Sequence, residues 1–379
     1  MSLVVTLTPE NNGFVENPIT MNVSSSSEVS YVVTANGTPV FTGSGTGNFA
    51  VNLAEMLAAV LEPLSPISGD DVLIALNKLE YTVEFVVTVT NAEQESQTVG
   101  MTAWRGGVSK LFYRQLTSSG KNIFTERFLN PSANFLFCDR GPGWEIAMKE
   151  TEVYPIPFVM PSGTMQIRDM MSGNVLAING TAGTLYALNI DALRYAFFDT
   201  YNVLTNLLSV EVDGQVVTRI CISRARLAPE RYLLRFASSL GNYQLMEVVG
   251  SASVSNEPET DELYQRYDSL VDDFVSQRSR VPSRRVISIS TGVKTAGEVA
   301  LLRDMLASDD VVLVGFDDAE LPVIATADDL TYRHRPTTPE SFTLKLTPVE
   351  YDRQITSDIL LESYSYPRIF SDEFNENFN

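Results

Sequence analysis

The chain has 379 residues and a mass of 41.8 kDa, more than one hydrophobic core usually holds, so its length predicts two or three domains. Hydrophobic residues make up 44% and charged residues 20%, which is typical of a folded protein and not of a disordered one. The net charge of −20 opposes binding to nucleic-acid backbones and anionic membranes, and one His with two Cys excludes the usual zinc sites.

The sequence offers no targeting or redox signal. Its first residues have no basic region and only a short apolar run, so we expect no signal peptide and synthesis in the cytoplasm. Cys138 and Cys221 lie 83 positions apart in apolar surroundings, which favours two buried thiols over a disulfide. We expect neither a cofactor nor a metal.

Residues 1–104 stand apart by charge, because they hold eleven acidic residues, one Lys and no Arg, a net of −10. Hydrophobic residues at 81, 83, 85, 87 and 89 alternate with polar ones, which predicts a strand with one buried face. Asn36-Gly37 predicts a type I′ turn between strands at 31–35 and 38–42. Asn52 is expected to cap a short helix over 52–61. We predict an acidic, immunoglobulin-like β-sandwich domain over residues 1–104.

Residues 105–255 are predicted to form a connector and a β-rich domain. Glycines and serines break residues 105–130, which we interpret as the connector. Leu193, Phe197 and Tyr201 recur at spacing four, so a helix is expected over 191–198. Strand patterns dominate the rest and lie at 145–149, 153–160, 166–168, 210–217, 219–223, 232–236 and 245–249.

Residues 256–355 are predicted to form a helical bridge and a small α+β domain. The bridge, 256–282, is polar with a weak helical stripe of Leu263, Tyr267, Leu270 and Phe274. Thr295 and Glu298 then form a capping box that begins a helix, and strands are expected at 286–290, 311–314, 321–326 and 342–346. This order, β, α, β, β, β, indicates an antiparallel sheet with one helix. The fold class is therefore mainly β and multidomain.

Residues 356–379 form a C-terminal arm that is too apolar for a solvated tail and too short for a domain. Large apolar side chains left in water are a liability unless a surface receives them. The arm either packs on its own chain or docks on a neighbouring subunit as an added strand, and we favour docking. Its candidate interface residues are aromatic: Tyr364, Tyr366, Phe370, Phe374 and Phe378.

No constellation of residues predicts catalysis. The single histidine, His334, has no nucleophile motif beside it, and we expect it in an exposed loop. The glycine-rich stretch 42–47 lacks the spacing and the Lys of a phosphate-binding loop, so a hairpin or strand-end loop is favoured. Five Asp-Asp pairs lack the alternating ligands of a calcium loop, and no carboxylate pair stands out as a glycosidase site.

Four arginines cluster near the predicted bridge: Arg278, Arg280, Arg284 and Arg285. A nucleic-acid patch would normally interleave aromatic residues with the basic ones, and acidic residues precede this cluster instead. We therefore expect these arginines to form salt bridges within or between subunits.

Several segments resemble a family of uncharacterised structural proteins from prophages of gut Bacteroidales, encoded among tail genes. The resemblance spans roughly residues 105–350, and its motifs consist of packing and turn residues. They are Arg105-Gly-Gly-Val-Ser109, Asn122-Ile-Phe-Thr125, Phe128-Leu-Asn130, Lys149-Glu-Thr-Glu152, Ala225-Arg-Leu-Ala-Pro-Glu-Arg-Tyr232 with Phe236, Ser239-Leu-Gly241, Ser290-Thr-Gly292 and Thr326-Ala-Asp-Asp-Leu-Thr-Tyr332. Residues 286–349 are also similar in layout to modules of phage tail-tip and distal-tail proteins.

The resemblance implies a non-enzymatic virion protein of the tail tip or baseplate, which assembles into a ring with itself and with other tail proteins. It implies neither specific nucleic-acid binding nor membrane insertion. The alternative is a carbohydrate-binding, adhesin-like β-sandwich protein, for which Trp104 and Trp144 are the stacking candidates. Both follow apolar alternation, so a core position is favoured for each.

Overall fold

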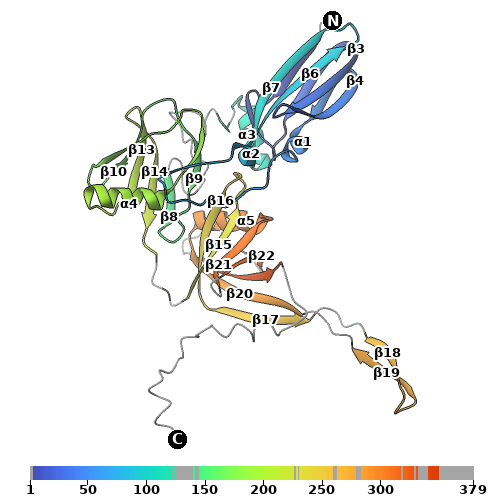
Figure 1. Ribbon diagram of the computed structural model, residues 1–379, viewed down its shortest axis with the longest axis vertical. Coiled ribbons are helices and arrows are strands. Elements are labelled where there is room, and N and C mark those ends of the chain that lie inside the picture. The colour runs from blue at the N-terminus through green and yellow to red at the C-terminus, as the bar shows by residue number, and fades with distance from the viewer. Residues whose placement is uncertain are drawn as a thin grey trace.

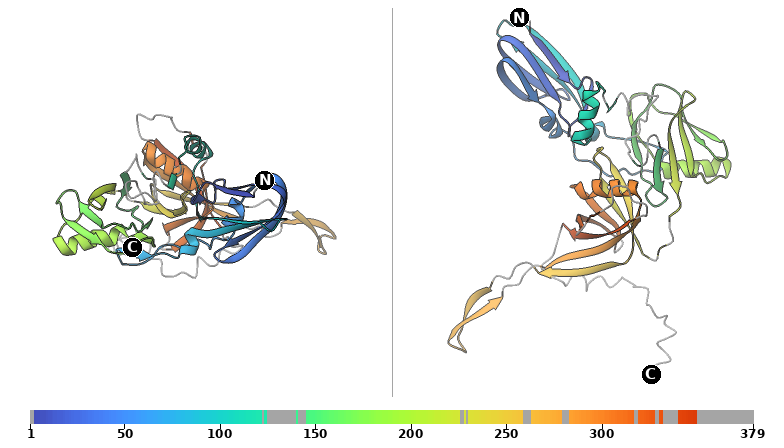
Figure 2. Two further views of the ribbon diagram at one scale, coloured as in Figure 1. Left: turned by 90° about the horizontal axis from the view of Figure 1, so that it is seen from above. Right: turned by 180° about the vertical axis from the view of Figure 1, so that it is seen from behind.

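The computed structural model describes residues 3–121, 123–124, 140, 145–225, 228, 230–258, 263–278, 283–316, 319–327, 330–331 and 340–349. It confirms the prediction of a mainly β, multidomain fold, with several separate sheets. Figures 1 and 2 show three bodies that meet near the centre of the molecule, and a hairpin that lies apart from them. Within the described residues, no helix is long and apolar enough to cross a membrane.

Six strands of the first unit form one hydrogen-bonded sheet with the order β1-β3-β6-β7-β2, and β4 pairs with β3. Strand β3 pairs with β1 over residues 20–24 and with β6 over residues 29–35. Between these two stretches its pairing with β4 shifts register, from Ser24 to Glu28. The side chain of Gln97 accepts a hydrogen bond from the Val5 amide (2.8 Å), so β7 also meets β1. The strands are β1 Val4–Thr8, β2 Asn12–Phe14, β3 Thr20–Ala35, β4 Thr38–Asn52, β6 Thr82–Asn91 and β7 Ser96–Trp104.

The alternation predicted for this unit is present, because Val83, Phe85 and Val87 point into its core and are at most 1% exposed. Asn36 and Gly37 have positive φ angles of 48° and 83°, as a type I′ turn requires. The glycine-rich stretch 42–47 was expected to be a loop. It lies inside strand β4 instead. Its glycines disguised the strand pattern, because glycine has low strand propensity.

The first helix, α1 Ala54–Ala58, is shorter than the predicted 52–61. The chain after it leaves the helical path, and the amide of Glu62 donates to the carbonyl of Leu79 instead of to a residue of the helix. The predicted connector also differs from expectation, since it contains helix α3 Lys110–Ser118. Ser109 caps α3 by accepting a hydrogen bond from the Phe112 amide (3.3 Å). Another short helix, α2 Lys78–Tyr81, precedes β6.

The middle unit contains two sheets and helix α4 Ile190–Tyr201, which Asn189 caps and which includes the predicted 191–198. The five-stranded sheet has the order β11-β10-β13-β14-β8 and the three-stranded sheet the order β5-β12-β9. Strand β5 belongs to residues 1–104 but pairs with β12, so the predicted first domain is not a single structural unit. The strands are β5 Leu73–Ala75, β8 Glu145–Lys149, β9 Ile156–Val159, β10 Met165–Asp169, β11 Val175–Ile178, β12 Leu185–Leu188, β13 Leu207–Val212 and β14 Gln215–Ser223.

The third unit is a seven-stranded antiparallel sheet, β16-β15-β21-β22-β23-β20-β17, with helix α5 Ala296–Ala307. The predicted capping box of Thr295 and Glu298 is present, and α5 buries Leu302 and Met305 in the core. The boundary predicted at residue 255 is wrong, because β15 and β16 join this sheet through pairing of β15 with β21. The strands are β15 Arg231–Ala237, β16 Tyr243–Val249, β17 Ala252–Pro258, β20 Ser283–Lys294, β21 Val311–Phe316, β22 Ala319–Ala327 and β23 Glu340–Pro348.

The predicted helical bridge is also wrong. Its described residues form strands β18 Leu263–Asp268 and β19 Asp273–Arg278, which pair with each other as a two-stranded sheet. The spacing of the apolar residues suggested a helix, but Asp268 and Ser269 open a turn, and the apolar residues on its two sides meet across the strands.

Candidate functional site

The hairpin of β18 and β19 is the first candidate for a functional surface, and we call it the arm. It lies beyond the end of β17 and β20, away from the three bodies (Figures 1 and 2). Tyr267 and Phe274 face each other across it, with ring centroids 5.5 Å apart. A two-stranded hairpin is marginally stable in water by itself, so a partner surface would add to the order of the arm.

The tip of the arm is apolar and solvent-exposed. Leu270 is 94% exposed and Val271 is 64% exposed. The turn that presents them is held by the Asp268 carboxylate, which accepts the Leu270 amide hydrogen (2.9 Å). On the other side of the turn the Tyr267 hydroxyl donates to Asp272, a hydrogen bond that raises the pKa of Tyr267. Local hydrogen bonds thus fix a turn whose apolar side chains contact little else.

The predicted arginine cluster lies at and below the base of the arm. Arg278 ends β19, whereas Arg280 lies outside the described residues. Arg284 and Arg285 begin β20, and the Arg285 guanidinium lies 5.4 Å from the centroid of the Phe316 ring. The structure therefore places the described members of the cluster where the arm joins the third unit.

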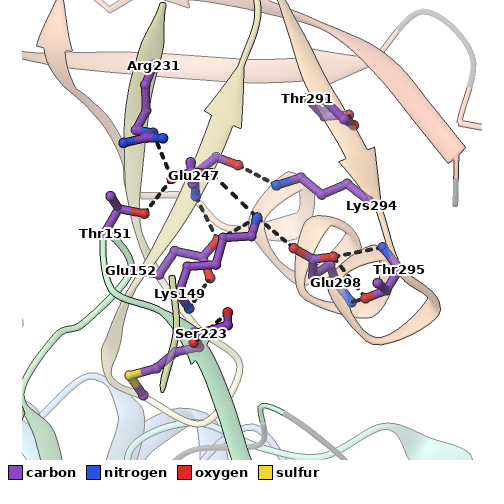
Figure 3. A network of polar contacts seen from close by, with 12 residues as sticks. Lys149, Thr151, Glu152, Ser223, Arg231, Glu247, Thr291, Lys294, Thr295 and Glu298 are labelled. Atoms are coloured by element: carbon purple, nitrogen blue, oxygen red, sulfur yellow. Dashed lines mark hydrogen bonds and ion pairs between the residues drawn. The ribbon is translucent and has the colours of Figure 1, made fainter. Parts of the chain in front are cut away.

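A network of charged residues joins the middle unit to the third unit and is the second candidate (Figure 3). Lys149 ends β8 in the middle unit, and its Nζ lies 2.8 Å from Glu298 Oε1 on α5. The same Nζ is 3.8 Å from Glu152 and 3.7 Å from Glu247 on β16. One ammonium group therefore connects three carboxylates from both units.

The two most buried carboxylates in this network have further partners. Glu152, 2% exposed, accepts the Glu247 amide hydrogen (3.0 Å) and pairs with Arg140 (2.7 Å). Glu247, 1% exposed, pairs with Arg231 (2.9 Å) and accepts a hydrogen bond from the Thr151 hydroxyl. Removing one partner of such a buried pair is strongly destabilising, because the remaining charge stays desolvated.

The network shifts the pKa values of two groups in particular. Burial, together with the charge of Lys149, lowers the pKa of Lys294 to about 8, and its ammonium donates to the Glu247 carbonyl. Burial acts against ionisation of Glu298, but hydrogen bonds from Lys149 and the Thr295 amide prevail and lower its pKa to about 2. At neutral pH Glu298 is therefore ionised and Lys294 is mainly protonated, and the arrangement of the network suits a clamp between two units.

A third set of contacts joins the first unit to the others. Trp104 at the end of β7 is 8% exposed and belongs to a core cluster that also contains Leu185 of the middle unit and Leu240 of the third unit. Gly106 has a φ of 92°, and a Cβ there would lie 2.5 Å from the Ser239 carbonyl oxygen, so only glycine fits this close approach. The Gly107 amide also donates to the Ser239 carbonyl (2.7 Å), which fastens the connector to the third unit.

Several residues singled out in the sequence lie outside the described residues. They are His334, Trp144, Cys138, Arg280 and the aromatic residues of the C-terminal segment 356–379, namely Tyr364, Tyr366, Phe370, Phe374 and Phe378. The core position predicted for Trp104 is confirmed, so its indole is not a platform for stacking sugars. Cys221 is half-buried on β14 as a free thiol, less enclosed than predicted. Among the described residues no group of three or more His, Cys, Asp or Glu side chains is arranged to hold a metal ion.

Sequence reasoning missed the polar network and the apolar tip. A weak signal existed for the network, because Glu247 and Lys294 are charged residues inside otherwise apolar or alternating strands. Glu247 pairs with Lys149, 98 positions away, and Lys294 donates to Glu247, 47 positions away, and no local pattern reveals such contacts.

Comparison with known proteins assigns no family. No family model matches the chain, and no curated protein matches it. One solved structure with some likeness is a Ca²⁺-stabilised adhesin with which an Antarctic bacterium binds ice; the TM-score is 0.15 and the sequence identity 9%, over 92% of this chain and 73% of that one. A TM-score this low does not establish a shared fold.

Proposed function

We propose that the chain is a non-enzymatic structural protein of a virion, a tail-tip or baseplate component that assembles into a ring. The single observation that carries this proposal is the arm, a hairpin with an exposed apolar tip held away from the body. Exposed apolar groups of this kind mark interaction surfaces, because water disfavours them.

The partner of the arm is a neighbouring copy of this chain. A hairpin that seats on a different part of the next copy makes a heterologous contact, and a ring results when the rotation between copies closes. Arg284 and Arg285, which lie near the start of β20 where the arm joins the third unit, are candidates for charged contacts at the rim of this interface.

The rest of the molecule suits a mechanical role. The polar network clamps the middle unit to the third unit, and Gly106 allows the connector to approach the third unit closely. Contacts of this kind favour a fixed arrangement of the units, which a subunit under mechanical load would need.

Sedimentation velocity of the full chain, with and without the double substitution Leu270→Ser and Val271→Ser, tests the proposal. We expect the wild type to form oligomers that increase with concentration, and the variant to weaken association by at least about tenfold. Leu111→Ser is the matched control, because Leu111 is 69% exposed on α3 and lies away from the arm. Equal association of the wild type and the tip variant would overturn the role of the arm.

A further inference from the structure

Strand β4 is an edge strand that presents a long open side. It has 15 residues, none of them buried, and β3 is its one strand partner among the described residues. Residues 38–52 contain no charged side chain and a single Pro. Natural sheets usually protect such edges with Lys, Pro or a covering segment, because an open edge accepts strands from other chains.

Aromatic rings extend across the glycines of β4. Gly43 pairs with Tyr31 of β3, and a Cβ at Gly43 would lie 2.4 Å from the Tyr31 ring. At Gly45 a Cβ would lie 2.6 Å from the Phe49 ring. Phe41 and Phe49 flank Tyr31 with ring centroids at 6.0 Å and 6.2 Å. The glycines therefore leave room for three neighbouring rings at the edge strand. Tyr31 is 6% exposed and Phe49 packs against the core, whereas Phe41 is 38% exposed and is the ring of this row that a partner can reach.

The C-terminal arm carries a sequence pattern that matches this edge. Over residues 363–378 the large aromatic residues occupy even positions only: Tyr364, Tyr366, Phe370, Phe374 and Phe378. Odd positions hold mostly Ser and Asn. In an extended strand, residues two or four positions apart lie on one face, so the five rings would share a face.

We propose that residues 363–378 of a second copy add to the open edge of β4 as a strand, with their aromatic face against the exposed ring of Phe41 at the end of the row that Tyr31 and Phe49 continue into the core. The 16 residues match the length of the 15-residue strand. Pro367 has no N–H and occupies an odd position, so an added strand is compatible with it where the odd residues turn their backbone groups away from β4. This inference rests on the proposed function in requiring self-assembly, but it uses a different contact from the hairpin tip.

The charges give this contact a distinctive dependence on salt. Residues 1–104 carry a net −10, and residues 363–378 carry three acids and one Arg, a net of −2. Because both partners are negative, screening by salt weakens their repulsion, and association through β4 strengthens as salt is added. A contact made by the arginine cluster with acidic residues would weaken instead.

The test uses sedimentation velocity of full-length chains with substitutions on each side of the contact. Phe41→Asp places a charge in the aromatic row, and Tyr364→Ser with Tyr366→Ser removes two of the incoming rings. Each variant is expected to weaken association by at least about tenfold. The matched controls are Val86→Asp, on the exposed face of β6 and 42% exposed, and Ile369→Ser, at an odd position of the segment 363–378. Both controls are expected to associate like the wild type.

Mixing the two variants completes the test. One variant keeps an intact edge and the other an intact aromatic segment, so the mixture is expected to associate more strongly than either variant does alone. Unchanged association of both variants overturns the inference. So does a lower melting temperature in both variants with no change in mass, because that result places the segment on its own chain. If the Leu270→Ser and Val271→Ser variant loses association while the β4 variants keep it, this inference fails and the proposed function stands.

Discussion

The ammonium of Lys149 lies 2.8 Å from the carboxylate of Glu298, and this ion pair ties the last residue of β8 to helix α5. The same carboxylate accepts hydrogen bonds from the amide and hydroxyl of Thr295, at 2.8 Å and 2.9 Å. Glu298 therefore serves the contact between units and the helix cap together, which makes it the most informative residue of the network to change.

Glu298→Gln is expected to lower the free energy of unfolding by about 1 to 3 kcal/mol, because it weakens the cap and leaves the Lys149 charge with fewer partners. Urea denaturation at pH 7 measures the loss. Glu320→Gln is the control, since Glu320 pairs with Arg235 but is 56% exposed, and it should cost no more than about 1 kcal/mol. Equal losses in the two variants would contradict the role of the network.

Acid should destabilise the protein through Glu298. The folded pKa is about 2 and the ordinary value is 4.5, so the unfolded chain takes up a proton at Glu298 first as pH falls. The stabilisation is present above pH 4.5 and is lost between pH 4.5 and about 2. Denaturation midpoints of wild type and Glu298→Gln should therefore converge in this range, whereas parallel curves would contradict the lowered pKa.

Alkali should have the opposite effect through Lys294. Its folded pKa is about 8 and its ordinary value 10.5, so between these values the unfolded chain holds the proton more often. The free energy of unfolding should then rise from pH 8 to about 10.5 in the wild type relative to Lys294→Met. Chemical denaturation of both proteins at pH 8 and pH 10 measures the difference, and no relative gain would show that Lys294 titrates normally.

Gly106→Ala should destabilise the junction between the connector and the third unit. The new Cβ would lie 2.5 Å from the Ser239 carbonyl oxygen and would also occupy a left-handed conformation, so we expect a loss of about 2 to 4 kcal/mol. Gly183→Ala is a matched control with a φ of 75° and no atom within 4 Å, and it should cost about 1 kcal/mol. Thermal unfolding of the two variants compares the costs directly.

Sequence patterns predicted those elements whose signals are local. Asn36-Gly37 turns as expected, the Thr295 capping box begins α5, and the alternation around Phe85 forms a buried face. These features depend on a few consecutive residues and on backbone geometry that those residues favour.

The remaining features depend on pairing between distant segments. Strand β15 joins the third sheet only because Leu234 pairs with Leu313, and the arm is a hairpin because Tyr267 meets Phe274 across a turn. The glycines of β4 made its sequence look like a loop, so the open edge was not predicted. Gly43 is needed in the strand because the Tyr31 ring lies over it and leaves no room for a Cβ. Sequence alone shows which residues are apolar but not which of them lack a covering surface.

The most direct test of the central claim is an electron-microscopy reconstruction of the particle formed by the full chain at high concentration. The expected result is a closed ring in which the tip around Leu270 of each subunit is seated on its neighbour. A chain that stays monomeric at all concentrations, or a ring in which the tips project freely into solvent, would contradict it.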